Sequence, residues 1–370
     1  MYLSVLATPL ILYHAHYGKA FFYIFLRKKI LMKTSNRKYK VKTVNHRIPP
    51  KKALCVINNS KVINQELKPY LSEQEMIKKI KKDIFLTNSD LIVLEKFLRK
   101  NSYFRFSIYV KLMKNLDNVT ILDVIETYKL DAFIRNQLHY FVNQIEIFWK
   151  KSLSDSMCVS YEENSIFPKN QCYLDKNIYS DLKWATKIID HFNSFFYSNQ
   201  SPSFKHHHDK KNHCLPIWAL FEEITFGSLT TFITQVNTEH YNNWVMSCYD
   251  DPKYKKTMRS WANVIRAYRN KIAHHSRIYA FKVTDAPKII RNDSKSYFPE
   301  NNLKETQKLY LYGGLYTIKH LLIYEDSMTQ TLWNKFLIDL EKKIDKIPSL
   351  EIDKYGFPEN WRNKLRIMIV

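Results

Sequence analysis

Glycine and closely spaced cysteines are scarce in this chain of 370 residues, and these scarcities exclude several kinds of protein. Only 5 glycines stand against 22 phenylalanines and 25 tyrosines. This ratio favours long helices over a turn-rich all-β design, and no glycine-rich loop for phosphate is present. The 5 cysteines are scattered, and no two are separated by only two residues. The pattern argues against a disulfide framework and is typical of a reduced cytoplasm.

A long hydrophobic run is also missing. The first 26 residues are apolar in patches, but Pro9, His14 and Lys19 interrupt them well short of the roughly 20 clean residues that a spanning helix needs. Charges follow the apolar part and no small-residue cleavage site is evident, so a secretory signal is not indicated. We therefore expect a cytoplasmic protein without a membrane partner, although a short anchor stays open, and Met32 offers an alternative start.

Acidic residues are nearly absent from the first 70 positions. That stretch holds 14 lysines and arginines and a single acid, Glu66, so it carries +13 of the net +23. A surface of this charge attracts polyanions, and the tyrosines and phenylalanines offer faces for unpaired bases. The stretch is a nucleic-acid contact, a membrane-surface contact or a solvated tail. We predict a basic arm over residues 1–65, a helical domain over 66–362 and a tail over 363–370.

Apolar residues recur at three- and four-residue spacing along most of the chain and predict an all-α fold. Ser72 and Glu75 form a capping-box pattern for a first helix. Further helices are expected over about 89–98, 120–154, 177–199, from 215, 251–273, 303–324 and 328–347. The pattern predicts a wedged segment at 101–109, loops at 155–175 and 201–214, a kink or close approach at Gly227, and irregular chain at 278–302.

The segment from Arg269 to Arg277 is the strongest functional signal, because it gathers cations, imidazoles and an amide at the end of one amphipathic helix. Asp251 as N-cap and Pro252 at the first position predict where that helix begins. At about 100° per residue, Arg269 and His274 are separated by roughly 140° around the axis. They should therefore flank a groove, and meeting at one phosphate requires a frayed helix end or a second copy of the helix. The residues alone leave another interpretation open, in which the arginine caps the helix and the histidines are solvated or packed.

Two other groups of residues are candidates for supporting roles. Glu146 lies on the long helix over 120–154 and could orient an arginine or histidine, and Arg105 is either a buried ion-pair partner or a phosphate contact. Residues 205–214 hold four histidines, an aspartate and a cysteine. Adjacent histidines splay apart and no paired cysteines follow, so we predict a basic loop near RNA, with Lys205 and His206 as contacts, and no metal site.

Six segments, read in order, resemble the Abi-like family of bacterial abortive-infection proteins of the AbiD and AbiF type, members of the HEPN superfamily. They are KPYLSEQEMI, NSYFRFSIY, YKLDAFIRNQLHYFVNQIEI, LPIWALFEEITFGSL, VIRAYRNKIAHHSRIY and YGFPENW. The resemblance covers about residues 66–362. Two departures are the basic arm, which lies outside the family pattern, and Tyr279, which stands where tryptophan is more usual.

The resemblance implies a HEPN-type helical bundle that acts in phage defence as a metal-independent endoribonuclease without a cofactor. Its R-x4-6-H motif falls on Arg269, Asn270 and His274, with His275 as the five-residue variant and Arg277 in support. One motif per chain implies a homodimer, and related proteins pair with a structured noncoding RNA. Two alternatives stay open: a non-catalytic module that grips a structured RNA, and an effector attached to a membrane through its N-terminus.

Overall fold

The computed structural model describes residues 52–53, 65–66, 69–163, 166–298 and 304–369, and it divides the chain into two units, 1–70 and 71–370. In the first unit, strand β1 (Lys52–Ala53) pairs antiparallel with strand β2 (Gln65–Glu66). Most of the basic arm and the apolar patches of residues 1–26 lie outside the described residues.

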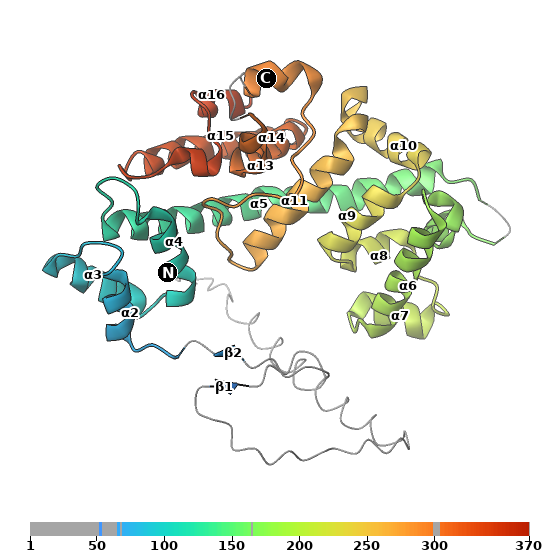
Figure 1. Cartoon of the computed structure of the whole chain (residues 1–370). Helices are drawn as coiled ribbons and strands as arrows, with labels where there is room; N and C mark the ends of the chain where they lie inside the picture. Colours follow the sequence, from blue (N-terminus) through green and yellow to red (C-terminus); the bar gives the residue numbers. More distant parts are fainter. Residues whose placement is uncertain (1–51, 54–64, 67–68, 164–165, 299–303, 370) are drawn as a thin grey trace, which may run out of the picture. The chain divides into compact units, whose positions relative to one another are not determined.

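The second unit is built of helices, which confirms the all-α prediction (Figure 1). Its α-helices are α2 (Glu73–Ile80), α3 (Asn88–Leu98), α4 (Tyr103–Met113), α5 (Ile121–Ser160), α6 (Leu182–Ser198), α7 (Pro202–Lys210), α8 (Ile217–Glu223), α9 (Phe226–Gln235), α10 (Thr238–Tyr249), α11 (Met258–Ala273), α12 (Ser294–Tyr297), α13 (Lys304–Leu309), α14 (Leu311–Leu322), α15 (Ser327–Ile344) and α16 (Trp361–Leu365). Short 3-10 helices are η1 (Lys169–Leu174), η2 (Lys176–Ile178), η3 (Pro252–Lys256), η4 (Arg291–Asp293) and η5 (Ile352–Tyr355).

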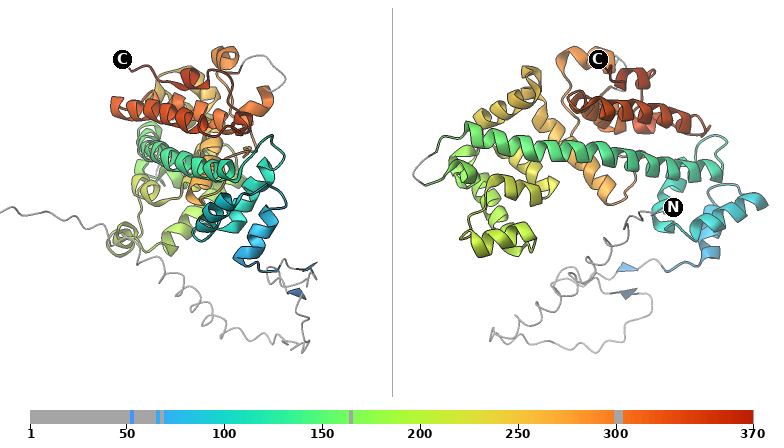
Figure 2. Two further views of the ribbon diagram at one scale, coloured as in Figure 1. Left: turned by 90° about the vertical axis from the view of Figure 1, so that its left-hand side faces the viewer. Right: turned by 180° about the vertical axis from the view of Figure 1, so that it is seen from behind.

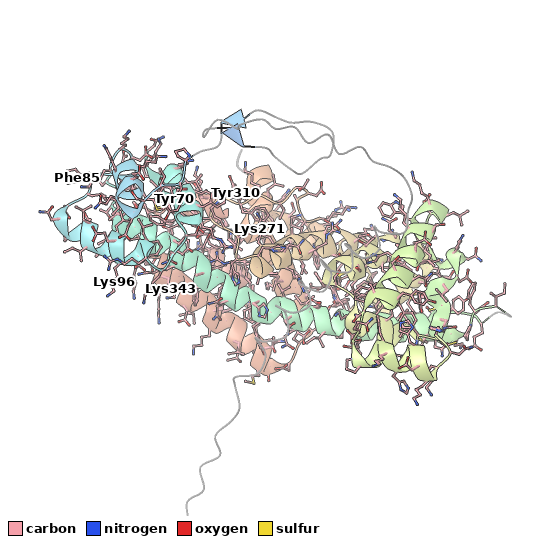
Figure 3. The ribbon with its side chains drawn as sticks, turned by 90° about the horizontal axis from the view of Figure 1, so that it is seen from below. Tyr70, Phe85, Lys96, Lys271, Tyr310 and Lys343 are labelled. Carbon is pink, nitrogen blue, oxygen red and sulfur yellow. The ribbon has the colours of Figure 1, made fainter. Side chains whose placement is uncertain are left out.

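Helix α5 is the axis of this unit. Its 40 residues span about 60 Å at the usual rise, and the views of Figures 2 and 3 show it running along the length of the unit. It packs against α4, α8, α10, α11, α14 and α15. The predicted apolar stripe is buried throughout; its members are Ile134, Leu138, Phe141, Ile145 and Trp149. Other residues of α5 outside this stripe are also buried, because helices pack on several of its faces.

Side-chain caps define where several helices begin. Ser72 and Glu75 form the predicted capping box at α2. Thr120 and Asp123 form a second one at α5, where each side chain bonds the backbone N–H of the other residue. These contacts satisfy N–H groups that the first helical turn leaves without partners. The starts of α2 and α5 therefore follow directly from local sequence.

Three segments that were expected to be wedged or looped contain helices, so those predictions were wrong in part. Residues 103–113 form α4, and α5 continues to Ser160 before η1 begins. The supposed loop at 201–214 contains α7, because Ser201 accepts a hydrogen bond from the backbone N–H of Phe204 and Pro202 occupies the first turn. Phe204 is buried against Phe196 of α6. The serine and proline at positions 201 and 202 therefore begin a helix, whereas we expected them to introduce a loop.

The start of α11 differs from expectation, whereas the predicted interruption near Gly227 is present. Asp251 caps the separate 3-10 helix η3, and α11 begins only at Met258. The chain breaks between α8 and α9 because Thr225 caps the new helix by accepting from the N–H of Ser228. A Cβ added at Gly227 would meet its nearest neighbour at an ordinary 3.6 Å, so this glycine marks no close approach.

The C-terminal helices fix α11 in place. Every residue of α14 is buried, and a Cβ added at Gly314 would lie 2.4 Å from Cε2 of Tyr268 on α11. This glycine therefore allows the two helices to approach closely. Beyond α15, Phe357 stacks on Trp361 with ring centroids 4.3 Å apart, and Leu365 and Ile367 are buried.

A buried polar cluster on α14 makes stability depend on pH. His320 Nε2 lies 2.9 Å from an Asp293 carboxylate oxygen, with Lys319 beside them. Burial lowers the pKa of His320 below its ordinary value, Lys319 and Lys253 act in the same direction, and Asp293 opposes them. The unfolded chain therefore binds a proton more readily than the folded chain below about pH 6.5.

We expect the free energy of unfolding to decrease as pH falls from about 7.5 to about 5.5, and His320→Gln to reduce that decrease. Urea denaturation at the two pH values measures both quantities. His206→Gln is the control, because His206 is exposed and should leave the pH dependence as in the wild type. A His320→Gln protein with the full wild-type pH dependence would contradict this origin.

Candidate functional site

The site begins at the last turn of α11. His274 is the C-cap, and His275 adopts a left-handed conformation with φ of 49°. The N–H of Ser276 bonds the carbonyl of Lys271 at 2.8 Å, and the N–H of His275 bonds the carbonyl of Ile272 at 3.0 Å. These two hydrogen bonds form a Schellman motif, in which glycine usually occupies the position that His275 holds here. The helix therefore ends in a defined turn that presents both imidazoles to solvent.

Helix α5 holds the chain that follows this turn. Asp131 is fully buried, and its carboxylate accepts hydrogen bonds from the backbone N–H groups of Ile278 at 2.7 Å and Tyr279 at 3.0 Å. One turn along α5, Arg135 Nη1 donates to the carbonyl of Ser276 at 3.1 Å. The segment after α11 is thus anchored by an acid and a base four residues apart on one helix.

Two tyrosine hydroxyls complete the surroundings of Asp131. Tyr355 donates to one carboxylate oxygen at 2.7 Å and Tyr109 to the other at 2.5 Å. Burial, together with the nearby carboxylate, raises the pKa of Tyr109. We did not single out Asp131 from the sequence. The sequence did contain one signal for it. Asp131 precedes Ile134 and Leu138 of the apolar stripe by three and seven residues, which places it on the same face of the helix as the stripe.

Arg269 and Glu146 lie together. Arg269 Nε is 3.4 Å from one carboxylate oxygen of Glu146, and Lys150 Nζ is 3.4 Å from the other. The Glu146 side chain is 13% exposed and that of Arg269 is 38% exposed. A small hollow of about 110 Å³ beside this pair is also lined by His139 and Asn143 of α5. Glu146 is thereby placed to orient the Arg269 guanidinium, and part of the Arg269 side chain faces solvent.

His274 lines a different and larger hollow of about 380 Å³. It shares this hollow with His275 and with a set of cations: Arg105, Arg135, Lys271 and Arg277. Burial, followed by the charge of Arg277, lowers the pKa of Lys271. Figure 3 shows Lys271 among the side chains of this unit. The concentration of positive charge favours a bound anion.

Two arginines of this hollow have unused hydrogen-bonding capacity. Nη1 of Arg277 is buried without a hydrogen-bond partner among the described residues. Arg105 is exposed and donates to the carbonyl of His275 at 3.4 Å, and no described acid pairs with it. Its interpretation as a buried ion-pair partner was therefore wrong. Both guanidinium groups can donate to phosphate oxygens.

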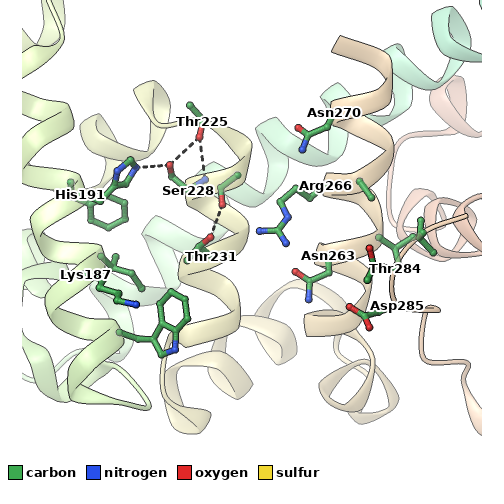
Figure 4. Close-up of a pocket in the computed structure, with 17 residues that line it drawn as sticks. Lys187, His191, Thr225, Ser228, Thr231, Asn263, Arg266, Asn270, Thr284 and Asp285 are labelled. Carbon is green, nitrogen blue, oxygen red and sulfur yellow. Dashed lines mark hydrogen bonds between the residues drawn. The ribbon is translucent and has the colours of Figure 1, made fainter. Parts of the chain in front are cut away.

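The structure separates the remaining candidates. Asn270 faces a third hollow, between α6, α9 and α11 (Figure 4). Lys205 and His206 are exposed on α7, which packs on α6 and lies apart from the last turn of α11 (Figure 1). Within one chain, Arg269 and His274 line different hollows, as their angular separation on the helix predicted.

The chain was compared with models of protein families. Residues 96–280, half of the chain, match the family model described as Abi-like protein. The chain belongs to the Abi-like family. No curated protein and no solved structure matches it. The matched range of this Abi-like chain contains Asp131, Glu146, α11 and the turn after it. Membership confirms the resemblance to this family and associates the chain with abortive infection, a defence of bacteria against phage.

Other features of this Abi-like chain bear on cofactors and surroundings. Over the ranges that the structure describes, no three histidine, cysteine or acidic side chains come together in a way that could ligate a metal ion. Cys158, Cys172, Cys214 and Cys248 are free thiols. None of the described helices combines the length and the apolar character required of a membrane span.

Proposed function

We propose that this Abi-like protein is a metal-independent endoribonuclease of the HEPN type that acts in phage defence. The observation that carries the proposal is the hollow at the end of α11, where His274 stands among four cationic side chains. An imidazole next to an anion-binding surface is suited to proton transfer at a phosphodiester. The net charge of +23 supports RNA as the polyanion.

In the proposed reaction, the ribose 2′-hydroxyl attacks the adjacent phosphorus while the bond to the 5′-oxygen breaks. The products are a 2′,3′-cyclic phosphate and a 5′-hydroxyl. His274 takes or gives the proton, since an imidazole can serve as either base or acid near neutral pH. Arg269 stabilises the negative charge that grows on the non-bridging oxygens, with Arg277 and His275 in support.

Arg269 and His274 of one chain line separate hollows, so the proposed site combines groups from two copies. An apolar surface next to His274 supports a homodimer. Phe104 and Ile108 of α4 line the same hollow, and Phe104 is 80% exposed. A second copy covering these side chains would remove apolar area from water.

A non-catalytic module that grips a structured noncoding RNA is the second candidate. The ion pair between Arg269 and Glu146 favours it, because an arginine held by a carboxylate is less available to a reacting phosphate. The cations around His274 would then contact RNA without proton transfer. Tight binding without cleavage products is the distinguishing result.

Arg269→Ala is expected to reduce RNA cleavage by roughly a hundredfold to a thousandfold, by analogy with the loss of other donors to a developing oxyanion. The assay detects 2′,3′-cyclic phosphate ends on RNA incubated with a chelator. Arg291→Ala is the matched control, because Arg291 is exposed on η4 and lies outside the hollows at the end of α11. Cleavage that survives Arg269→Ala, stops with the chelator or occurs equally on DNA would refute the nuclease.

A further inference from the structure

Another hollow of the helical unit lies beside α11 and is lined by residues other than Arg269. It has a volume of about 870 Å³, within the range of small-molecule sites. Helices α6 and α9 form one wall, and α11 with residues 283–285 forms the other (Figure 4). Asn270 of the motif also lines this hollow.

Three basic side chains face this hollow. Lys187 and His191 project from α6, and Arg266 projects from α11 toward them (Figure 4). Arg266 has no ion pair or hydrogen bond with any residue that the structure describes. Asp285 is the one carboxylate among the lining residues, so positive charge exceeds negative charge here. A guanidinium and an ammonium facing each other across a hollow favour a phosphate between them.

The wall formed by α9 is preorganised for an anion. His191 Nε2 lies 2.8 Å from the Ser228 hydroxyl, which lies 2.9 Å from the Thr225 hydroxyl (Figure 4). Thr225 is the N-cap of α9, so the positive end of a ten-residue helix faces the same space. These contacts hold the imidazole and hydroxyls in place before a ligand arrives.

The same hollow also offers a surface for a base. Trp184 lines the hollow and is 40% exposed, and the ammonium of Lys187 lies 4.8 Å from the centre of the Trp184 ring. An exposed indole stacks on unpaired bases of any kind. The side-chain amides of Asn263 and Asn270 stand on α11 across the hollow, where they can pair with the polar edge of a base (Figure 4).

We propose that this hollow binds one phosphorylated nucleotide. Its phosphate lies between Arg266, Lys187 and the start of α9, and its base lies against Trp184. The nucleotide is either free or one unit of an RNA strand. Asn270 precedes His274 by four residues, about 6 Å along the helix, so a strand anchored here can continue to the end of α11. If the nucleotide is one unit of an RNA strand, the inference rests on the proposed function.

Binding is measured at about physiological salt with two probes, adenosine 5′-monophosphate and a mixed-sequence 2′-O-methyl RNA, which cannot be cut by 2′-hydroxyl attack. Arg266→Ala is expected to weaken binding by at least about tenfold, as for the loss of a charge-assisted hydrogen bond. Trp184→Ala is expected to weaken it roughly fivefold or more. Lys183→Ala is the control, because Lys183 is exposed one turn before Lys187 and does not line the hollow.

If Arg266→Ala loses binding to both probes, the hollow is a site that accepts a free nucleotide. If it loses binding only to the oligonucleotide, the hollow is a subsite for RNA. The inference is overturned if the wild type binds neither probe, or if Arg266→Ala and Trp184→Ala bind as Lys183→Ala does. Circular dichroism confirms that each variant is folded. If the wild-type protein cuts no RNA but Arg266→Ala weakens binding, the result supports this site while the proposed nuclease fails.

Discussion

Replacing His274 with alanine should reduce RNA cleavage by about a hundredfold to ten-thousandfold, the usual contribution of a positioned acid or base. The imidazole is exposed at the end of α11, so its loss leaves the buried face of the helix unchanged. RNA binding should persist, because the cations of the same hollow remain. Single-turnover cleavage and equilibrium binding, measured on the same RNA, separate the two effects.

Two other histidines serve as comparisons. His275→Ala tests the alternative proton-transfer group, and a smaller loss is expected because His275 mainly shapes the turn through its left-handed backbone. His213→Asn removes an exposed imidazole beyond α7, and asparagine tolerates the left-handed backbone found there. Cleavage by His274→Ala at the rate of His213→Asn would remove His274 from the mechanism.

Asp131→Ala should destabilise the fold by about 3–5 kcal/mol, because several buried donors lose their common acceptor. The backbone N–H groups of Ile278 and Tyr279 and the hydroxyls of Tyr109 and Tyr355 all bond this carboxylate. The turn carrying His274 should also become more mobile, since this contact anchors the chain just after it. Urea denaturation measures the stability, and amide hydrogen exchange of residues 274–279 measures the mobility.

Asp190→Ala provides the matched control for this prediction. Asp190 is exposed on α6, so its loss should change the stability by no more than about 0.5 kcal/mol. Asp131→Asn keeps the shape but turns part of the acceptor into a donor, and it should also destabilise the protein. Equal stability of Asp131→Ala and Asp190→Ala would show that the buried bonds contribute little.

Much of the fold could be predicted where local contacts decide the structure. The capping box of Ser72 and Glu75 and the apolar stripe of α5 are both present as predicted. Helix α4 was missed because its aromatic residues occur on both buried and exposed faces: Phe106 is fully buried and Phe104 is 80% exposed. Periodicity cannot reveal a helix whose exposed face is also apolar.

The candidate site was only partly predictable for a related reason. Helical geometry alone predicts that Arg269 and His274 point in different directions, and the two line separate hollows. Asp131 is far from this segment in sequence, and its role depends on how α5 packs beside α11. The same holds for Arg266, which meets Lys187 and His191 only because α6 and α9 fold back toward α11.

The central position of α5 has a consequence for how the protein is made. Residues 121–160 leave the ribosome early, but the partners that cover them include α8, α10, α11, α14 and finally α15, which ends at Ile344. At about 5–20 residues per second, these apolar faces remain uncovered for roughly ten seconds or more of synthesis. The partner helices can therefore pack around α5 only late in synthesis. Chaperones that shield exposed apolar segments should bind the nascent chain during translation.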